Sequence, residues 1–425
     1  MKKKLLAFAV AAALLAPQAV GAEGFAIYEW SAEGLAMGGA RMFAENDAAN
    51  MAYNPASITK VKGEAAKISA TYLSPHGKYD AYQGENIVES GHNRVHPAWA
   101  PGMYYVKQMN DKEWIGMGTY SRFGMVSQFE RNSLAGTNAF SSKLNGISLG
   151  INYARKLDKK FTASLGAEVN YVGLQLDKNQ GIQTETPLGV VGGRGGMHIE
   201  GDSYALGWNA AANYEFDDKN EIGVVYRSKI THSMEADYDF HPSMALYSAN
   251  GVVPVGVTHM KGGAYGVVTL PESIDVGYSH KFNDKTRIEA RYTWTRWERY
   301  DALNMNFDTL GYVEQPKNWS NGQRFALGLE HKFSDKYSGL MGIAYDKSSI
   351  PYDGGDFMIP TGTRTTYGLG AQYHDKKQTL GFALAWMNVG CLDFAGHPAK
   401  GDAFTSAHTR DSYTKIASIS YQRNF

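Results

Sequence analysis

Residues 161–171 read FTASLGAEVNY, and apolar and polar side chains alternate along the whole stretch. The odd positions carry Phe, Ala, Leu, Ala, Val and Tyr, whereas the even positions carry Thr, Ser, Gly, Glu and Asn. Successive side chains of a β-strand point to opposite faces, so this strand has one apolar and one polar face. That pattern is typical of a membrane barrel, whose strands meet lipid on one face and the lumen on the other.

The same alternation recurs in 203–215, 221–229, 286–295 and 323–330, and in the last two the polar positions are often charged. A Lys or Arg that faced lipid at the bilayer midplane would cost about 2–4 kcal/mol, so the charged positions must face a polar lumen. Such segments number about fourteen, and an even number is typical of single-chain outer-membrane barrels. The sequence therefore predicts an all-β fold, an antiparallel transmembrane β-barrel over residues 63–425.

Short and long connections alternate between these segments. Short turns rich in Asp, Asn, Ser and Lys occur at 157–160, 216–220, 282–285, 333–336 and 374–377, as expected at a periplasmic end. The long polar stretches 177–202 and 231–270 contain Gly, Pro and His. We predict that these two stretches are extracellular loops and candidate binding surfaces.

The N-terminus carries an export signal. Three lysines precede an apolar run at 5–16, and small residues end at Ala22, so residues 1–22 are predicted to be a cleaved signal peptide. Together with the barrel, this places the protein in the outer membrane of a Gram-negative bacterium. Residues 23–62 are rich in Gly, Ala and Asn and lack the alternation of a strand. They are predicted to form a hatch, a plug inside the lumen.

Composition and motifs exclude several functions. Acidic and basic residues balance at 42 each, which gives no reason to expect a nucleic-acid partner. Cys391 is the single cysteine, and the twelve histidines show no metal-binding spacing, so neither a metal site nor a cofactor is expected. Gly146, Ser148 and Gly150 fit a serine-hydrolase pattern, but they lie within an alternating strand and lack the strand–turn–helix elbow of those enzymes. An enzyme is therefore not expected.

The hatch resembles the N-terminal segment of the FadL/TodX (OMPP1) family of outer-membrane transporters. The residues that carry the resemblance are Gly24, Phe25, Ser31, Gly34, Leu35, Gly38, Gly39, Ala40, Asp47, Ala48, Ala49, Asn50, Asn54, Pro55 and Ala56. A second similarity lies in GMGTYSRFGMVSQFE, residues 116–130, which resembles the family's third strand, where a kink opens a gap in the barrel wall.

The resemblance implies a monomer that transports hydrophobic small molecules passively and releases them sideways through this gap into the outer-membrane lipids. Long-chain fatty acids are the favoured ligand, with aromatic or alkane hydrocarbons second. The expected site residues are Asn54, Pro55 and Ala56 in the hatch, Gly118, Phe123, Gly124 and Met125 at the gap, and Leu188, Val190, Met244, Leu246 and Tyr247 in the outer capture loops.

A fatty-acid carboxylate also needs a cationic contact, and the interior candidates are Arg227, Lys229, Arg291 and Arg324. These charges also have a purely structural explanation, as paired residues that stiffen the lumen. Similarly, Asn54-Pro55-Ala56 would serve as a simple turn, and the apolar patches of the loops would serve for packing. An outer-membrane lipase or protease and a hydrophilic porin remain the alternative functions.

Overall fold

The computed structural model describes residues 24–186, 189–248, 251–253, 259–300, 302–309 and 311–425. The predicted signal peptide and Leu188 lie outside these residues. The described strand segments form one sheet of 22 members. Their bounds are β1 Glu64–Gln83, β2 Asn86–His92, β3 Ala98–Asn110, β4 Glu113–Tyr120, β5 Gly124–Gln128, β6 Ser141–Lys156, β7 Phe161–Thr186, β8 Gly189–Glu215, β9 Asn220–Arg227, β10 Ile230–Ser248, β11 Gly251–Val253, β12 Met260–Leu270, β13 Ser273–Lys281, β14 Thr286–Thr295, β15 Ala302–Phe307, β16 Gly311–Pro316, β17 Gly322–Lys332, β18 Tyr337–Lys347, β19 Arg364–His374, β20 Gln378–Val389, β21 Asp393–Ala395 and β22 Ser406–Asn424.

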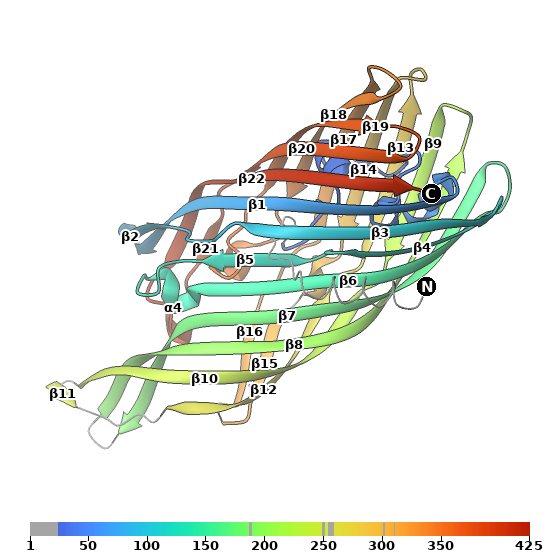
Figure 1. Ribbon diagram of the computed structural model, residues 1–425. Coiled ribbons are helices and arrows are strands. Elements are labelled where there is room, and N and C mark those ends of the chain that lie inside the picture. The colour runs from blue at the N-terminus through green and yellow to red at the C-terminus, as the bar shows by residue number, and fades with distance from the viewer. Residues whose placement is uncertain (1–23, 187–188, 249–250, 254–258, 301, 310) are drawn as a thin grey trace.

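These segments close into a barrel of 14 antiparallel strands, as the sequence predicts (Figure 1). β1 pairs with β22, which joins the two ends of the sheet. Five barrel strands are each made of two successive segments, namely β4 with β5, β9 with β10, β12 with β13, β14 with β15, and β16 with β17. The short β2, β11 and β21 only extend the hairpins of β1, β10 and β22.

The two faces of the strands differ as the alternation predicts. Leu165 and Leu206 on the outer face are 62% and 76% exposed, whereas the inward Glu289 and Arg291 are 0% and 3% exposed. Apolar side chains thus cover the outside, and charges lie within the lumen. In the described residues, no helix is long and apolar enough to cross a membrane.

The predicted extracellular loops differ from the structure, because most of their described length is strand. β7 and β8 stay paired from Asp177↔His198 to Thr186↔Gly189, and β10 runs on to Ser248. The loop prediction was wrong because a strand that projects beyond the membrane meets water on both faces. It then loses its apolar alternation while the backbone ladder continues. Val190 therefore lies on β8, and Met244, Leu246 and Tyr247 lie on β10.

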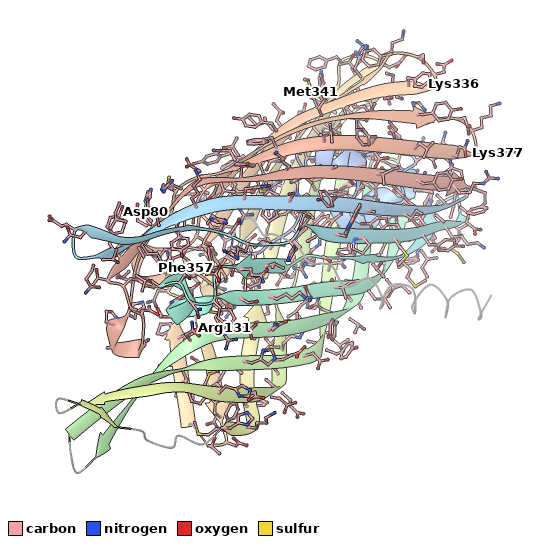
Figure 2. All side chains as sticks on the ribbon, turned by 60° about the vertical axis from the view of Figure 1, so that its left-hand side comes forward. Asp80, Arg131, Lys336, Met341, Phe357 and Lys377 are labelled. Carbon is pink, nitrogen blue, oxygen red and sulfur yellow. The ribbon has the colours of Figure 1, made fainter. Side chains whose placement is uncertain are left out.

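The short turns share one local design. Asp158 accepts hydrogen bonds from the backbone N–H groups of Lys160 and Phe161, and Asp375 accepts them from Lys377 and Gln378. Asp217, Asn283 and Ser334 repeat the arrangement. Short side chains that bond to backbone two residues on favour tight turns. Lys336 and Lys377 mark this turn end of the barrel, and Asp80 lies toward the opposite end (Figure 2).

The segment before β1 is packed inside the barrel, nearer to the turn end (Figure 1). It contains α2 Ala32–Ala36, α3 Asn50–Tyr53 and the 3₁₀ helix η1 Pro55–Lys60. Ser31 caps α2 by accepting a hydrogen bond from Gly34 N, as expected of an N-cap serine. The remaining helices are α4 Ala135–Ala139, η2 Trp297–Arg299, η3 Tyr352–Gly354 and η4 Pro398–Lys400.

Candidate ligand passage beside the hatch

The barrel wall is interrupted between β4 and β5. From Tyr120 to Gly124 the chain takes four residue steps, while its partner β6 takes three, from Ser148 to Asn145. The extra residue makes this a bulge, which bends the strand and leaves a residue unpaired. The bulge lies within residues 116–130, where the sequence predicts the interrupted third strand.

The bulge also leaves backbone edges without a strand partner across the wall. β3 pairs with β1 along its whole first half, Ala98 to Gly102, but its described pairing with β4 begins only at Met103. β5 pairs with β6, and its other edge has no strand pairing in the described residues. The wall therefore has a break between the first half of β3 and β5.

The leading edge of the hatch lies against this break. Gly124 N donates to Phe25 O at 2.9 Å, and Ile27 N donates to Arg122 O at 2.8 Å, around a bridge between Ala26 and Phe123. Hydrogen bonds that a wall strand would otherwise supply to the bulge thus come from the hatch. Any movement of the hatch edge must expose this break.

Phe25 anchors a cage of aromatic rings. Its ring centroid lies 4.7 Å from Trp297, 5.2 Å from Tyr300 and 5.9 Å from Phe123, mostly edge to face. Trp319 completes the cage, 5.2 Å from Trp297. Phe123, Trp297, Tyr300 and Trp319 all lie in interruptions of barrel strands, where the chain leaves the ladder and the side chains enter the lumen. No local pattern in the sequence signals this convergence, because these four residues come from three distant spans of the chain.

Two glycines are required at this site. Gly24 adopts φ +65°, and a Cβ there would lie 2.4 Å from the Trp319 ring, so a side chain would be strained and would displace the cage. Gly146 on β6 faces the bulge, where a Cβ would lie 2.5 Å from Phe123 O. The first glycine of the hydrolase-like pattern thus has a structural explanation, since it leaves room for the bulge.

A cavity of about 80 Å³ adjoins both the hatch edge and the break. Gly24 and Arg364 lie at its inner side, and Met125 and Ser127 of β5 form one wall. Pro75, Tyr79, Phe129, Met358 and Ile359 supply most of the remaining apolar lining. Met125 therefore lines the cavity and belongs to β5, the strand that borders the break, whereas Gly118 packs against the Tyr104 ring on the paired part of β4.

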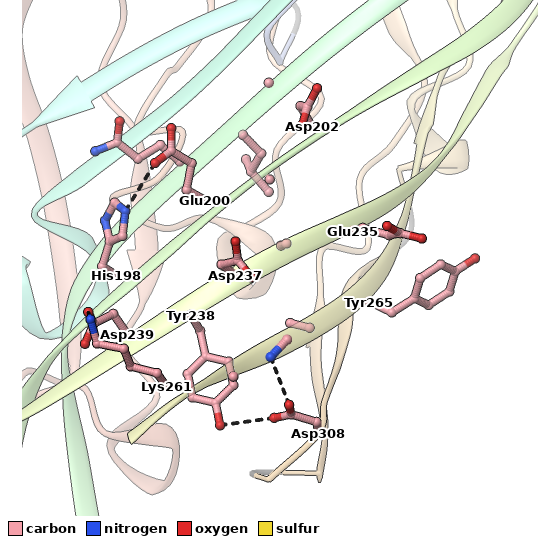
Figure 3. A pocket seen from close by; sticks show the side chains of 18 of the residues that line it. His198, Glu200, Asp202, Glu235, Asp237, Tyr238, Asp239, Lys261, Tyr265 and Asp308 are labelled. Carbon is pink, nitrogen blue, oxygen red and sulfur yellow. Dashed lines mark hydrogen bonds and ion pairs between the residues drawn. The ribbon is translucent and has the colours of Figure 1, made fainter. Parts of the chain in front are cut away.

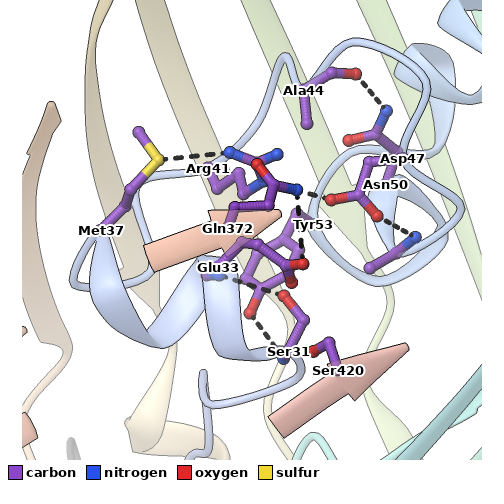
Figure 4. A network of polar contacts seen from close by, with 12 residues as sticks. Ser31, Glu33, Met37, Arg41, Ala44, Asp47, Asn50, Tyr53, Gln372 and Ser420 are labelled. Atoms are coloured by element: carbon purple, nitrogen blue, oxygen red, sulfur yellow. Dashed lines mark hydrogen bonds and ion pairs between the residues drawn. The ribbon is translucent and has the colours of Figure 1, made fainter. Parts of the chain in front are cut away.

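The rest of the hatch is held by buried ion pairs and by the polar contacts around Glu33, Arg41 and Asp47 that Figure 4 shows. Lys67 Nζ contacts Glu33 and Asp47 at 2.8 Å each, and Arg41 links Asp47 to Glu330 at 3.2 Å on each side. Burial alone would raise the pKa of Asp47, but Lys67 and then Arg41 outweigh it and lower that pKa to about 2. The Asp47 carboxylate is therefore ionised at neutral pH.

The arginines predicted as carboxylate contacts take part in the same anchoring. Arg227 and Arg291 share Asp275 at 2.8 Å, and Arg324 pairs with Asp346 at 2.8 Å. Their guanidinium groups also donate to hatch carbonyls, of Ala52, Gly39 and Gly38 respectively. Lys229 lies between β9 and β10 and is exposed. The carboxylate-binding role of these four residues stays a prediction, but three of them already hold the hatch.

Asn54 of the hatch has two structural contacts. Its amide Nδ2 donates to Asn213 Oδ1 at 2.8 Å, and its Oδ1 accepts from Ala56 N at 3.2 Å, which caps η1 at Pro55. Asn213 in turn donates to Ser57 Oγ at 2.9 Å. The tripeptide therefore forms a turn that is also fastened to the wall, while a role in ligand binding stays a prediction.

Sequence reasoning missed a buried ammonium group beside the cage. Lys317 is 2% exposed and pairs with Asp356, in the interruption that also supplies Trp319. Lys178 of β7 lies close enough to Asp402 and Lys317 for their charges to act on it. Lys317 lies just after β16, outside the alternating pattern of the strands. Its position in the sequence therefore does not indicate that its side chain points into the lumen.

The hydrolase-like serine is part of the lumen wall. Ser148 lies within β6, paired with Tyr120 and Asn170, and its hydroxyl accepts from Asn170 Nδ2 at 2.9 Å. The ring of His232 contacts the other end of that amide, at 2.9 Å from Nε2 to Oδ1. The strand continues past Ser148 without the elbow that a nucleophile needs.

Residues 12–422 match the family model described as "Outer membrane protein transport protein (OMPP1/FadL/TodX)". The chain belongs to this family. It is therefore a Gram-negative outer-membrane β-barrel transporter of hydrophobic compounds and not an enzyme. The recognition made from the hatch and residues 116–130 is confirmed.

Several curated members of the family are similar to this chain over most of its length. The long-chain fatty acid transport protein of Escherichia coli O6:H1 is 27% identical over 390 residues, which cover 86% of each chain. Outer membrane protein P1 of Haemophilus influenzae is 28% identical over 413 residues, 88% of this chain and 87% of that protein.

Solved structures share the fold. A Pseudomonas aeruginosa FadL homologue has a TM-score of 0.84 at 20% identity and covers 95% of this chain and 100% of its own. The P. putida toluene transporter TodX has a TM-score of 0.70 at 17% identity, over 94% of this chain and 99% of its own. At these identities the likeness establishes the architecture alone.

Proposed function

We propose that this FadL-family monomer takes up long-chain fatty acids passively, holds them at the aromatic cage, and releases them laterally through the wall break between β3 and β5. The observation that carries this proposal is the position of Phe25 and Phe123. The first belongs to the hatch edge and the second to the bulge, and their rings touch within one cage. A ligand in that cage would contact the hatch and the exit together.

The lateral route follows from the energetics of an alkyl chain. Burying a methylene group contributes about 0.8 kcal/mol, which would be lost in a hydrated lumen. Between the cage and the periplasmic turns lies the rest of the hatch, with the buried ion pairs of Lys67 with Glu33 and of Arg41 with Glu330. A ligand that moved straight along the lumen would meet these buried charges. The path through the break passes Met125 and leads straight to lipid. Phe123, Gly124 and Met125 form the gap in this proposal, and Gly118 lies next to it on the paired part of β4.

For the fatty-acid carboxylate, we assign the contact to Lys317 before Arg227, Arg291 or Arg324. Lys317 lies beside the cage, while each arginine would have to release a hatch carbonyl to bind a ligand. Curated relatives over most of this length carry names as long-chain fatty acid transport proteins. Ligand would first meet Leu188, Val190, Met244, Leu246 and Tyr247 at the outer end, which keep their proposed capture role.

Aromatic hydrocarbons are the second candidate ligand. The cage consists of aromatic rings arranged edge to face, a geometry that also suits a small aromatic guest. A hydrocarbon has no carboxylate and would not need Lys317. The requirement for Lys317 therefore distinguishes the two candidate ligand classes.

The test is uptake into proteoliposomes of labelled oleate, toluene and a small sugar. Deleting Phe123 shortens the segment from Tyr120 to Gly124 to three residue steps, which equals the three steps of β6 from Ser148 to Asn145, and should close the break in the wall. We therefore expect oleate uptake to fall to the level of empty liposomes, while the circular dichroism spectrum stays unchanged. Phe333→Ala, at an exposed periplasmic turn, serves as the control and should transport as wild type. Sugar flux without oleate or toluene uptake would contradict the proposal, and so would full uptake by the sealed barrel.

A further inference from the structure

A second cluster of interacting side chains lies far from the hatch, where β10 and β12 project from the barrel. Asp239 and His241 are two residues apart on β10 and so share a face. The outermost described rung of the β10–β12 ladder is Phe240↔Met260, which places His241 opposite His259 just beyond it. Their rings stack with centroids 4.1 Å apart and an interplanar angle of 18°.

Both imidazoles converge on one carboxylate oxygen. His259 Nε2 lies 2.5 Å and His241 Nε2 lies 3.0 Å from Asp239 Oδ1. All three potential ligand atoms are within 4.8 Å of one another. Zinc binds His nitrogen and carboxylate oxygen at about 2.0–2.2 Å, so the three atoms need to move little to share one ion.

The surroundings of the cluster also suit an ion. Asp239 Oδ2 accepts from Lys261 Nζ at 2.8 Å, which leaves Oδ1 as the oxygen that faces the histidines. Ligating carboxylates are usually held by such an outer partner. His241 and His259 are exposed, and the cluster borders an open outer concavity of about 1450 Å³ lined by Asp239 and Lys261 (Figure 3). Water or a second donor could therefore complete the coordination.

We propose that Asp239, His241 and His259 bind one divalent transition-metal ion, with Zn²⁺ as the reference metal. Two imidazoles and one carboxylate suit Zn²⁺, Cu²⁺ or Ni²⁺, whereas Ca²⁺ and Mg²⁺ prefer oxygen ligands alone. The ion joins β10 and β12 beside residues 242–248 of β10. It thereby fixes the segment that carries Met244, Leu246 and Tyr247. The sequence predicts no metal site, because the two histidines are eighteen positions apart and only the strand register brings them together.

A separate pair on β21 and β22 supplies a matched control. His408 Nδ1 lies 2.6 Å from Asp393 Oδ1, and His408 is a partly exposed strand histidine with a carboxylate partner, as in the cluster. It has one imidazole where the cluster has two. His408→Ala removes the same number of atoms from a comparable surface without touching the proposed site.

The test is isothermal titration calorimetry of the whole purified protein, stripped with a chelator, with Zn²⁺ as titrant. We expect one ion per chain, a loss of affinity of about 10–100-fold in His241→Ala or His259→Ala, and unchanged affinity in His408→Ala. Lys261→Met should bind more weakly, because the outer partner that holds the Asp239 carboxylate in place is gone. The measurement stands whether or not the chain carries fatty acids.

Electron paramagnetic resonance of bound Cu²⁺ adds a structural readout. The wild type should show coupling to two imidazole nitrogens, and each single histidine variant to one. Equal Zn²⁺ affinity of the wild type and the double variant His241→Ala/His259→Ala would overturn the proposal, including the case in which neither binds. Persistence of two-nitrogen coupling in either single variant would overturn it as well.

Discussion

Two parts of the hatch contact the barrel in different ways. The front edge, residues 24–27, is held by backbone hydrogen bonds to the bulge and by the aromatic cage. The rear part, residues 31–60, is held by buried ion pairs such as Lys67 with Glu33 and Lys60 with Glu221 at 2.9 Å. A neutral hydrogen bond contributes about 0.5–1.5 kcal/mol, whereas breaking one partner out of a buried ion pair costs about 3–5 kcal/mol. The front edge is therefore the part that can move while the rear part stays in place.

The strongest challenge to this comparison is Lys67→Met in the rear part. It leaves Glu33 and Asp47 without their shared ammonium, at a cost of about 3–5 kcal/mol, so the rear part should detach from the wall. We expect higher ion conductance in planar bilayers and a lower urea midpoint. Lys285→Met, at an exposed turn, should change neither. Wild-type conductance of Lys67→Met would show that these ion pairs do not hold the hatch.

Phe25→Ala tests the front edge alone. Removing a buried phenyl ring costs about 3 kcal/mol, and here the loss should loosen the cage and not the ion pairs. Oleate uptake should change while ion conductance stays low, which distinguishes this variant from Lys67→Met. Phe216→Ala, an outward-facing residue at a turn, is the control. Raised conductance in Phe25→Ala would mean that the two parts move together.

Lys317 separates the two ligand classes at the cage. The double variant Lys317→Met/Asp356→Asn removes the ammonium without leaving a buried charge. We expect oleate binding to weaken about tenfold, which corresponds to about 1.4 kcal/mol, while toluene binding is unchanged. Fluorescence quenching of the cage tryptophans measures both ligands. Equal losses for both would indicate damage to the cage and remove Lys317 from carboxylate recognition.

Asn54 fastens the rear part with neutral contacts only. Asn54→Ala loses the bond to Asn213 and the cap of η1, at a cost of about 1 kcal/mol. A double-mutant cycle with Asn213→Ala, measured by urea unfolding, isolates the bond to Asn213 from the cap and should return a coupling of about 0.5–1 kcal/mol. Additive effects would show that the bond between the two amides contributes nothing.

The smallest effect is expected at a periplasmic turn. The backbone N–H groups of Lys377 and then Gln378 lower the pKa of the Asp375 carboxyl in the folded protein. The carboxylate therefore contributes to stability above the unfolded pKa of about 3.9. This contribution is lost as the pH falls through the lower pKa of the folded state. Asp375→Ala should thus lower the urea midpoint at pH 7, and the difference from wild type should shrink below about pH 4. Lys376→Ala should match wild type. A difference that stays constant over this pH range would exclude the carboxylate as its source.

The sequence by itself determined the barrel and the presence of a hatch. The barrel wall has lipid outside and a polar lumen inside, so apolar and polar side chains must alternate along each strand. The sequence alone therefore assigns Phe325 to the outer face and Arg324 to the inner face. Turn residues such as Asp158 act on backbone only two or three positions away, which makes the turns readable as well. The bulge region was found by resemblance, and its glycines gave it a local rationale.

Only the tertiary structure decided which residues meet. The cage joins Phe25 of the hatch with Phe123, Trp297 and Trp319 from three separate strand interruptions. The charge pairs of the hatch likewise depend on contacts that no local pattern encodes. The sequence also did not predict how far β7, β8 and β10 extend beyond the membrane. Apolar and polar side chains alternate only where the two faces of a strand meet different surroundings, and these parts meet water on both faces. The meeting of His241 with His259 follows from strand register, which is set by the ladder and not by spacing along the chain.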